Sequence, residues 1–184
     1  MLENKTVLLG ICACTPAYKA LDLIGMLKRK GADVKTAVTE NATNMVPIAM
    51  LERLSGNPVS KDQFGEPYVW DPDKKAWGRK GDVLVIAPCT ANMIGKLANG
   101  IADDFISTNT LSFPGPKVIG VNMNPMLWEN PAVQRNVAQL KEDGYYFVDN
   151  GNPDHPSRMP SLEAIMAVIE EATTETLEAR DSDA

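Results

Sequence analysis

The sequence predicts an α/β fold, a single three-layer domain built on a Rossmann-like, doubly wound parallel sheet. Three observations support it. Short apolar runs recur along the chain, segments with apolar residues at helical spacing separate them, and residues typical of helix caps stand at the boundaries. Strands that alternate with helices form a parallel sheet covered on both faces. With 184 residues, 44% of them hydrophobic, the chain is long enough for one substantial core.

Five or six strands are expected in this sheet. Residues 83–87, Val-Leu-Val-Ile-Ala, form an uninterrupted apolar run typical of a strand that is buried on both faces. The other predicted strands are short apolar runs separated by predicted helices, and they cover residues 6–10, 33–39, 117–121 and 145–148.

Helices are predicted between the strands from periodicity and capping residues. Two apolar faces have helical spacing, one formed by Ala17, Ala20, Leu21, Ile24 and Leu27 and the other by Val133, Val137 and Leu140. Thr15 followed by Pro16 predicts the start of the first helix, and Lys30-Gly31 its end. Gly100 marks the end of the helix after residues 83–87. Further helix starts are predicted at Asn41, Asp103-Asp104, Asn130 and Ser161.

Two segments interrupt the alternation of strands and helices. Residues 57–81 form a long excursion of the kind that serves as a lid or a contact surface, and its Trp70 and Trp77 favour a subunit contact over stacking on a ligand. Residues 150–160, rich in glycine and proline, predict an irregular flap. We therefore expect one domain over residues 1–175 and a disordered acidic tail over residues 176–184.

Composition restricts the class of partner and the compartment. The net charge is −6 and no dense run of lysine or arginine is present, which argues against nucleic acid as a partner. No apolar run approaches the roughly 20 residues that span a bilayer, and the first residues carry no secretory pattern, so we expect a cytoplasmic protein without membrane contact. Three cysteines without framework spacing fit reduced thiols in that compartment.

The first strand-to-helix turn is a candidate phosphate site. Residues 10–15, Gly-Ile-Cys-Ala-Cys-Thr, stand where main-chain N–H groups and the helix dipole stabilise an anion. The turn has neither the Gly-x-Gly-x-x-Gly nor the Walker pattern, so a plain turn is an equally good interpretation of these residues alone. Thr39, at the end of the second predicted strand, adds a hydroxyl beside the turn and favours the phosphate interpretation.

The end of the 83–87 strand is a second candidate site. Thr90 and Asn92 supply a hydroxyl and an amide at the carboxyl end of a buried strand, where open parallel sheets bind ligands. Such a rim suits a flat heteroaromatic cofactor. Cys12, Cys14 and Cys89 follow the same two strands and could approach the same crevice, although small apolar filling is the favoured interpretation and we predict no metal site.

Three ordered stretches resemble one known family. Residues 17–19, residues 87–92 continuing through 100–104, and residues 123–128 followed by 130–134 are similar to motifs of the FMN-binding flavoproteins related to phosphopantothenoylcysteine decarboxylase and to the peptidyl-cysteine decarboxylases of lantibiotic synthesis. The similarity covers roughly residues 5 to 170. Departures at binding positions are small: Cys12, Ala13 and Cys14 replace small residues, often glycine or serine, Val121 replaces proline, and Leu127 replaces methionine.

The resemblance implies a Rossmann-like protein that binds FMN between the subunits of a homotrimer, or of a dodecamer made from trimers. It places the FMN phosphate at Gly10, Cys12, Ala13, Cys14 and Thr15, with help from Thr39, and the isoalloxazine against Ala87, Pro88, Cys89, Thr90 and Asn92. It also implies that Asn124 holds a substrate carboxylate.

The decarboxylase part of the resemblance has two departures. Lys74 stands near the position of the family's catalytic histidine, and the flap contains no cysteine. The single histidine, His155, lies among prolines and acids and is interpreted as a surface residue. We therefore expect flavin redox chemistry on a small molecule, or electron transfer to a redox partner. The alternatives are a phosphopantothenoylcysteine decarboxylase-like enzyme of coenzyme A biosynthesis and a non-catalytic flavin-binding module.

Overall fold

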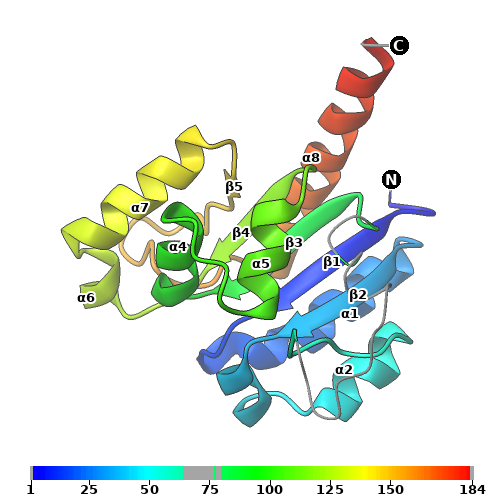
Figure 1. Ribbon diagram of the computed structural model, residues 1–184, viewed down its shortest axis with the longest axis horizontal. Helices are drawn as coiled ribbons and strands as arrows, with labels where there is room; N and C mark the ends of the chain where they lie inside the picture. The colour runs from blue at the N-terminus through cyan, green and yellow to red at the C-terminus, as the bar shows by residue number, and fades with distance from the viewer. Residues whose placement is uncertain (1, 64–76, 78–79, 183–184) are drawn as a thin grey trace.

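A five-stranded, all-parallel sheet forms the centre of the molecule. The computed structural model describes residues 2–63, 77 and 80–182, and its strands lie in the order β2-β1-β3-β4-β5 (Figure 1). This confirms the predicted Rossmann-like, doubly wound α/β fold. The strands are β1 (Thr6–Ile11), β2 (Asp33–Val38), β3 (Val83–Cys89), β4 (Lys117–Val121) and β5 (Tyr146–Phe147).

The strand order reverses between β1 and β3. The chain runs from β1 outward to β2, and then returns to place β3 on the opposite side of β1. In the register of this pair Gly10 lies opposite Ile86, and beyond the paired residues the Cys12 N–H donates to the Pro88 carbonyl oxygen at 3.1 Å. A reversal of this kind opens a crevice at the carboxyl ends of the two strands, because the connections after them leave on opposite sides.

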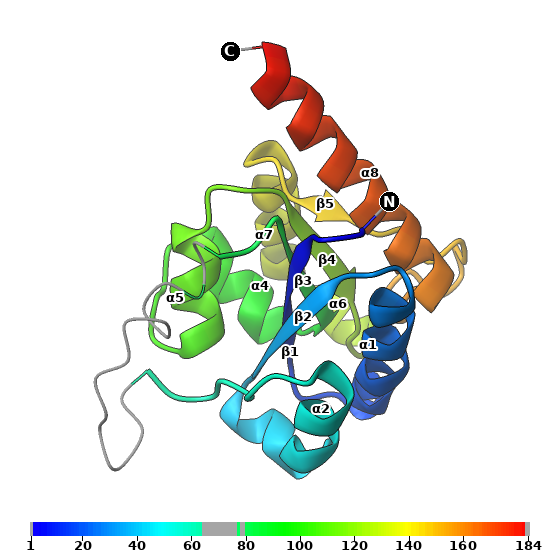
Figure 2. The same cartoon turned by 90° about the vertical axis from the view of Figure 1, so that its right-hand side faces the viewer.

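Helices cover both faces of the sheet and make the three layers (Figure 2). One face carries α1 (Lys19–Arg29), α2 (Ile48–Ser55) and α8 (Leu162–Ser182), and the other carries α4 (Ala91–Ala98), α5 (Phe105–Ser112) and α7 (Pro131–Glu142). The short η1 (Thr15–Tyr18), η2 (Glu40–Asn44) and α6 (Pro125–Trp128) follow the carboxyl ends of β1, β2 and β4.

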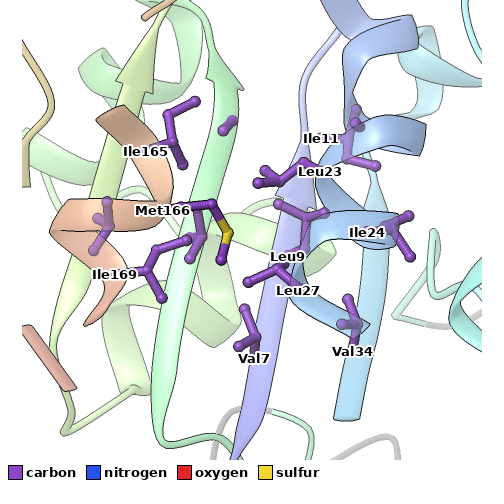
Figure 3. Close-up of a cluster of buried hydrophobic side chains, with 14 of the residues drawn as sticks. Val7, Leu9, Ile11, Leu23, Ile24, Leu27, Val34, Ile165, Met166 and Ile169 are labelled. Atoms are coloured by element: carbon purple, nitrogen blue, oxygen red, sulfur yellow. The ribbon is translucent and has the colours of Figure 1, made fainter. Parts of the chain in front are cut away.

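The central strand β1 shows why the core has two parts. Val7, Leu9 and Ile11 point toward α1 and α8, where Figure 3 shows them among Leu23, Met166 and Ile169. Leu8, on the opposite side of β1, belongs to the cluster of α4, α5 and α7. Both sides of the strand are therefore buried, which explains its continuous apolar sequence in place of an apolar–polar alternation.

Three of the predicted helix caps are confirmed. The side chain of Asn130 accepts from the Ala132 N–H at 2.9 Å and begins α7. Ser161 Oγ accepts from the Ala164 N–H at 3.1 Å and begins α8. Asp104 and Ser107 form a capping box at the start of α5. Each cap is a local contact between a side chain and the backbone, so the sequence predicts it well.

Two other predicted caps are wrong. Thr15 does not cap α1: it is the first residue of η1, whose N-cap is Cys14 and makes no side-chain cap bond, and α1 begins only at Lys19. Asn41 lies inside η2, and Pro47 is the N-cap of α2. In both places the chain makes a short 3₁₀ turn before the α-helix, which moves the helix start beyond the residue with capping propensity.

The ends of several elements also differ from the prediction. Strand β3 continues two residues further, to Cys89, whereas β5 contains two residues only. Helix α8 runs to Ser182 and so includes most of the tail that was expected to be disordered. Glutamate, alanine, leucine and arginine are good helix formers, so this acidic stretch can continue the helix. None of the helices in the described residues combines the length and apolar character needed to cross a membrane.

Candidate functional site

A cavity of about 870 Å³ opens at the carboxyl ends of the central strands. It lies at the crevice where the strand order reverses, the usual ligand position in this architecture. Its volume falls within the range of small-molecule and cofactor pockets. The lining residues come from the segments after β1, β2, β3 and β4: Ala13, Cys14, Thr15, Thr39, Glu40, Asn41, Thr90, Ala91, Asn92, Met93, Lys96, Asp103, Asp104, Asn122, Met123, Asn124 and Leu127.

The turn after β1 presents main-chain donors to the cavity. In the described part of the chain, the N–H groups of Ala13, Cys14 and Thr15 have no protein acceptor. Thr39 also lines the cavity, as predicted from the end of β2. Main-chain N–H groups at such a turn can bind an anion without a cationic side chain. The arrangement therefore fits the phosphate of a cofactor such as FMN.

Gly10 and Cys12 were predicted to belong to the same turn, but they do not line the cavity. Gly10 lies inside β1 and outside the cavity lining, and a Cβ atom there would be 3.1 Å from Ile106 Cγ2. The glycine thus permits the close approach of α5 to the sheet. Cys12 is 1% exposed and points into the core beside Cys89. Of the predicted phosphate turn, residues 10–15, only residues 13–15 therefore line the cavity.

The segment after β3 forms a second wall. Thr90 caps α4, its Oγ1 accepting from the Met93 N–H at 3.4 Å, and Asn92 presents a side-chain amide without a protein partner among the described residues. Ala87, Pro88 and Cys89 are buried within β3 and do not line the cavity. Thr90 and Asn92 thus supply the rim that the sequence predicts, whereas residues 87–89 belong to the buried strand behind it.

The segment after β4 closes a third side. Asn124 Oδ1 accepts from the Met126 N–H at 2.8 Å and caps α6, so its amide nitrogen remains available as a donor. Asn122 also lines the cavity, and its Oδ1 accepts from the Met159 N–H at 3.1 Å. Sequence reasoning identified Asn124 from its motif but missed Asn122, which stands two residues earlier on the same wall.

An ionic cluster occupies the end of the cavity near α4 and α5. Lys96 Nζ lies 2.7 Å from Asp103 Oδ1 and 2.6 Å from Asp104 Oδ2, and its side chain is 17% exposed. Burial lowers the pKa of Lys96, but the hydrogen bonds to Asp103 and Asp104 outweigh it and raise the pKa above its ordinary value. Because both carboxylates already hold this ammonium, an anionic ligand depends on the main-chain donors of the first turn.

The three thiols have unequal surroundings. Burial raises the pKa of Cys14 to about 11, so the cavity-facing thiol stays protonated near neutral pH. Burial raises the pKa of Cys89 well above its usual value, whereas a hydrogen bond with Cys89 lowers that of Cys12. Among the described residues no three histidine, cysteine or acidic side chains form a set that could hold a metal ion.

The remaining sequence-predicted residues lie away from the cavity or outside the described residues. Lys74 and Trp70 fall in the second group. His155 does not line the cavity and belongs to the flap. Trp77 is 5% exposed and packs edge-on against Phe105, with ring centroids 5.4 Å apart, so it belongs to the core rather than to the predicted subunit contact.

Comparison with known proteins agrees with this geometry. A family model described as Flavoprotein matches residues 1–174. The coenzyme A biosynthesis bifunctional protein CoaBC of Bacillus subtilis is 40% identical over 152 residues, which are 81% of this chain and 37% of CoaBC. The probable phosphopantothenoylcysteine decarboxylase of Streptococcus mutans is 34% identical over 144 residues, 77% of this chain and 80% of that protein. The chain thus spans just over a third of the length of the CoaBC proteins it matches.

Solved structures show the same architecture. The FMN-dependent cysteine decarboxylase SpaF is 32% identical, with a TM-score of 0.83 that covers 95% of this chain and 98% of SpaF. MrsD from a Bacillus species is 25% identical, with a TM-score of 0.82 and coverage of 94% and 98%.

Proposed function

The chain belongs to the Flavoprotein family, and from this premise we propose that it is an FMN-dependent enzyme that decarboxylates a cysteinyl carboxylic acid. The family and the FMN-dependent solved relative bear out the prediction of FMN as the cofactor. The observation that carries the proposal is the cavity itself, which combines free main-chain donors after β1 with amide groups after β3 and β4.

Among the functions considered from sequence, the relatives favour decarboxylation over the redox or electron-transfer function that was our first expectation. Both curated relatives are named for coenzyme A biosynthesis or phosphopantothenoylcysteine decarboxylation, and SpaF is named as a cysteine decarboxylase. We therefore propose phosphopantothenoylcysteine as the first substrate to test. A peptide that ends in cysteine is the second.

The roles of the residues follow from the donors they present. When bound, FMN would accept two electrons from the thiol-bearing carbon of the substrate and convert it to a C=S group. That group could accept the electron pair released when the neighbouring carboxylate leaves as carbon dioxide, and the reduced flavin would then return its two electrons to the substrate. The turn at Ala13, Cys14 and Thr15 would hold the phosphate, and Thr90 and Asn92 would orient the ring. Asn124 would hold the substrate carboxylate through its free amide nitrogen.

Proton transfer is assigned to Lys74 from the family resemblance. No histidine lines the cavity in the described ranges 2–63, 77 and 80–182. A lysine accepts a proton near neutral pH when its pKa is lowered, so Lys74→Ala should abolish turnover and Lys74→His should retain it. Retention of full activity in Lys74→Ala would remove this residue from the proposal.

A homotrimer, or a dodecamer made from trimers, is proposed for the assembled protein. Large apolar side chains are exposed at the cavity, where Leu127, which lines it, is 51% exposed and neighbouring Met126 is 81% exposed. Tyr18, at the end of η1, is 55% exposed. Exposed apolar residues of this size are typical of a surface that is covered by another chain. Sedimentation of the FMN-loaded protein tests it, and a monomer at micromolar concentration would contradict it.

The central experiment measures FMN and carbon dioxide separately. The purified protein should show flavin absorption, and carbon dioxide release should be measured with each of the two substrates. Asn124→Ala should bind FMN but lose at least about 100-fold in kcat/KM, because the carboxylate loses its charge-assisted donor. Asn130→Ala is the matched control, since Asn130 caps the next helix in the same way but does not line the cavity. FMN binding without carbon dioxide release from either substrate would refute decarboxylation while leaving the cofactor assignment intact.

A further inference from the structure

Asn122 and Asn124 stand two residues apart on the wall that follows β4, and both line the cavity. Main-chain bonds fix this wall. The Asn122 N–H donates to the Cys89 carbonyl oxygen at 2.9 Å, and the next residue, Met123, donates its N–H to the Ser157 carbonyl oxygen at 2.9 Å. Two residues span at most about 7 Å even when extended, so the Cα atoms of the asparagines lie within that distance. The wall therefore offers two neighbouring side-chain amides to one ligand.

Both amides have their oxygen bonded to the protein. Asn122 Oδ1 accepts from the Met159 N–H at 3.1 Å, and Asn124 Oδ1 accepts from the Met126 N–H at 2.8 Å. A main-chain N–H can bond only to the oxygen end of a carboxamide, so these bonds leave the NH₂ end of each side chain for the cavity. An NH₂ group donates and does not accept. The wall thus presents two neutral donors whose orientation is fixed by the backbone.

Two adjacent donors select a ligand group with two acceptor atoms. A carboxylate has two oxygens and no proton, so it can accept from one donor at each oxygen. A primary carboxamide has a single oxygen, and its own NH₂ group would face the second donor. Lys96, the one cation among the described residues that line the cavity, is already held by Asp103 and Asp104. A carboxylate at this wall therefore depends on the two amides.

We propose that Asn122 is a second substrate-binding residue, whose amide nitrogen donates to one oxygen of the substrate carboxylate while Asn124 donates to the other. This role rests on the proposed function, which supplies the cysteinyl acid, and it adds selection for a free carboxylate over a carboxamide at the same carbon. Neutral donors also suit the reaction. A carboxylate loses its charge as it leaves as carbon dioxide, so a tightly paired cation would stabilise the starting state more than the transition state.

Binding of unreactive analogues tests the pair of donors without turnover. Alanine replaces cysteine in each of the two proposed substrates, which removes the thiol, and each analogue is prepared as the free acid and as the primary carboxamide. Isothermal titration calorimetry of the FMN-loaded protein measures both forms near pH 7, where the carboxyl group is ionised. We expect wild type to bind a free acid at least about tenfold more tightly than its carboxamide, because the carboxamide leaves a donor unpaired.

Three variants separate a substrate contact from a structural role. Asn122→Asp keeps an oxygen acceptor for the Met159 N–H but replaces the donor with an anion, so the preference for the acid should reverse. Asn122→Ala should weaken binding of the acid by about tenfold and of the carboxamide by less than about threefold. Asn150→Ala is the control, since Asn150 Nδ2 bonds the Arg158 carbonyl oxygen of the flap at 3.0 Å but does not line the cavity, and it should keep the preference.

The outcomes distinguish the role of Asn122 from the proposed function. Circular dichroism first establishes that each variant is folded, and flavin absorption that it holds FMN. An unchanged preference in Asn122→Asp would refute the contact, and so would loss of the preference in Asn150→Ala. Weaker FMN binding by Asn122→Ala with an unchanged preference would assign the residue to the cofactor instead. Carbon dioxide release by a wild type that binds acid and carboxamide equally would refute the contact alone, whereas a wild type that binds neither form of either analogue would overturn both proposals.

Discussion

At the scale of single residues, the site depends on neutral donors rather than on charge. Asn92, Asn122 and Asn124 line the cavity, and the cationic Lys96 on the same wall is already held by two aspartates. Neutral amides orient a carbonyl or a carboxylate without the large desolvation cost of an unpaired buried ion. The value of Asn122 and Asn124 is geometric, because the amide oxygen of each is held by a main-chain N–H.

Cys14 gives the first prediction at this scale. Its pKa of about 11 leaves far less thiolate at pH 8 than a free cysteine has, so iodoacetamide should modify it about 100-fold more slowly than free cysteine. Mass spectrometry of the Cys14 peptide measures the rate, and it should rise with pH up to about 11. Cys12 and Cys89 serve as internal controls, because burial should keep both unmodified in the folded protein. Rapid modification of Cys14 at pH 7 would show that the thiol is not buried as described.

At the scale of elements, helix starts build most of the site. Helix α4 presents Asn92 from its first turn, α6 begins directly after Asn124, and the Asp104 cap of α5 holds Lys96. A capping side chain accepts an N–H bond of the first turn, which sets the direction in which the preceding loop enters the helix. The loops around the cavity are therefore held in place by the helices that follow them.

A second prediction concerns Asp104, which both caps α5 and pairs with Lys96. Two variants distinguish these roles. Asp104 accepts from the Ser107 N–H at 2.8 Å and from Lys96 Nζ at 2.6 Å. Asp104→Ala should lower the free energy of unfolding by about 1–2 kcal/mol, measured by urea denaturation, because α5 loses its cap. Asp104→Asn should lose less, since the amide oxygen still caps the helix while Asp103 still holds Lys96. Equal losses in the two variants would assign the effect to charge instead of capping.

At the scale of the whole molecule, cofactor binding should stabilise the fold. At the proposed site FMN would lie against the ends of β1, β2 and β3, so its binding would link the two halves of the sheet that meet between β1 and β3. At about 100 times its Kd, a ligand that binds only the folded state adds about 2.7 kcal/mol. For a domain of this size the thermal midpoint should rise by roughly 5–10 °C.

Riboflavin is the matched ligand for this measurement because it lacks only the phosphate. If the N–H groups of the β1 turn hold that phosphate, riboflavin at the same concentration should raise the midpoint less than FMN does. An equal shift for the two ligands would place the phosphate away from the turn. The comparison needs no substrate, so it tests the orientation of the cofactor independently of catalysis.

Much of the fold and part of the site could be predicted from the sequence. The apolar run of β3, the caps at Asn130 and Ser161, and the motif residues Thr90, Asn92 and Asn124 all depend on contacts within a few residues of the chain. Glu40, Asn41 and Lys96 line the same cavity, yet none of them was predicted to do so. Their contribution depends on which loops meet after the strands are ordered.

The sequence by itself determined the class of the fold, most of the strands and the family, because periodicity, capping and motifs are local properties of the chain. Only the tertiary structure decided that Gly10 serves the packing of α5, that Cys12 and Cys89 lie in the core, and that Asn122 joins the end of β4 to the 150–160 flap. The physical reason is that these roles depend on the return of β3 to the other side of β1. That long-range pairing brings together segments whose local sequences carry no sign of one another.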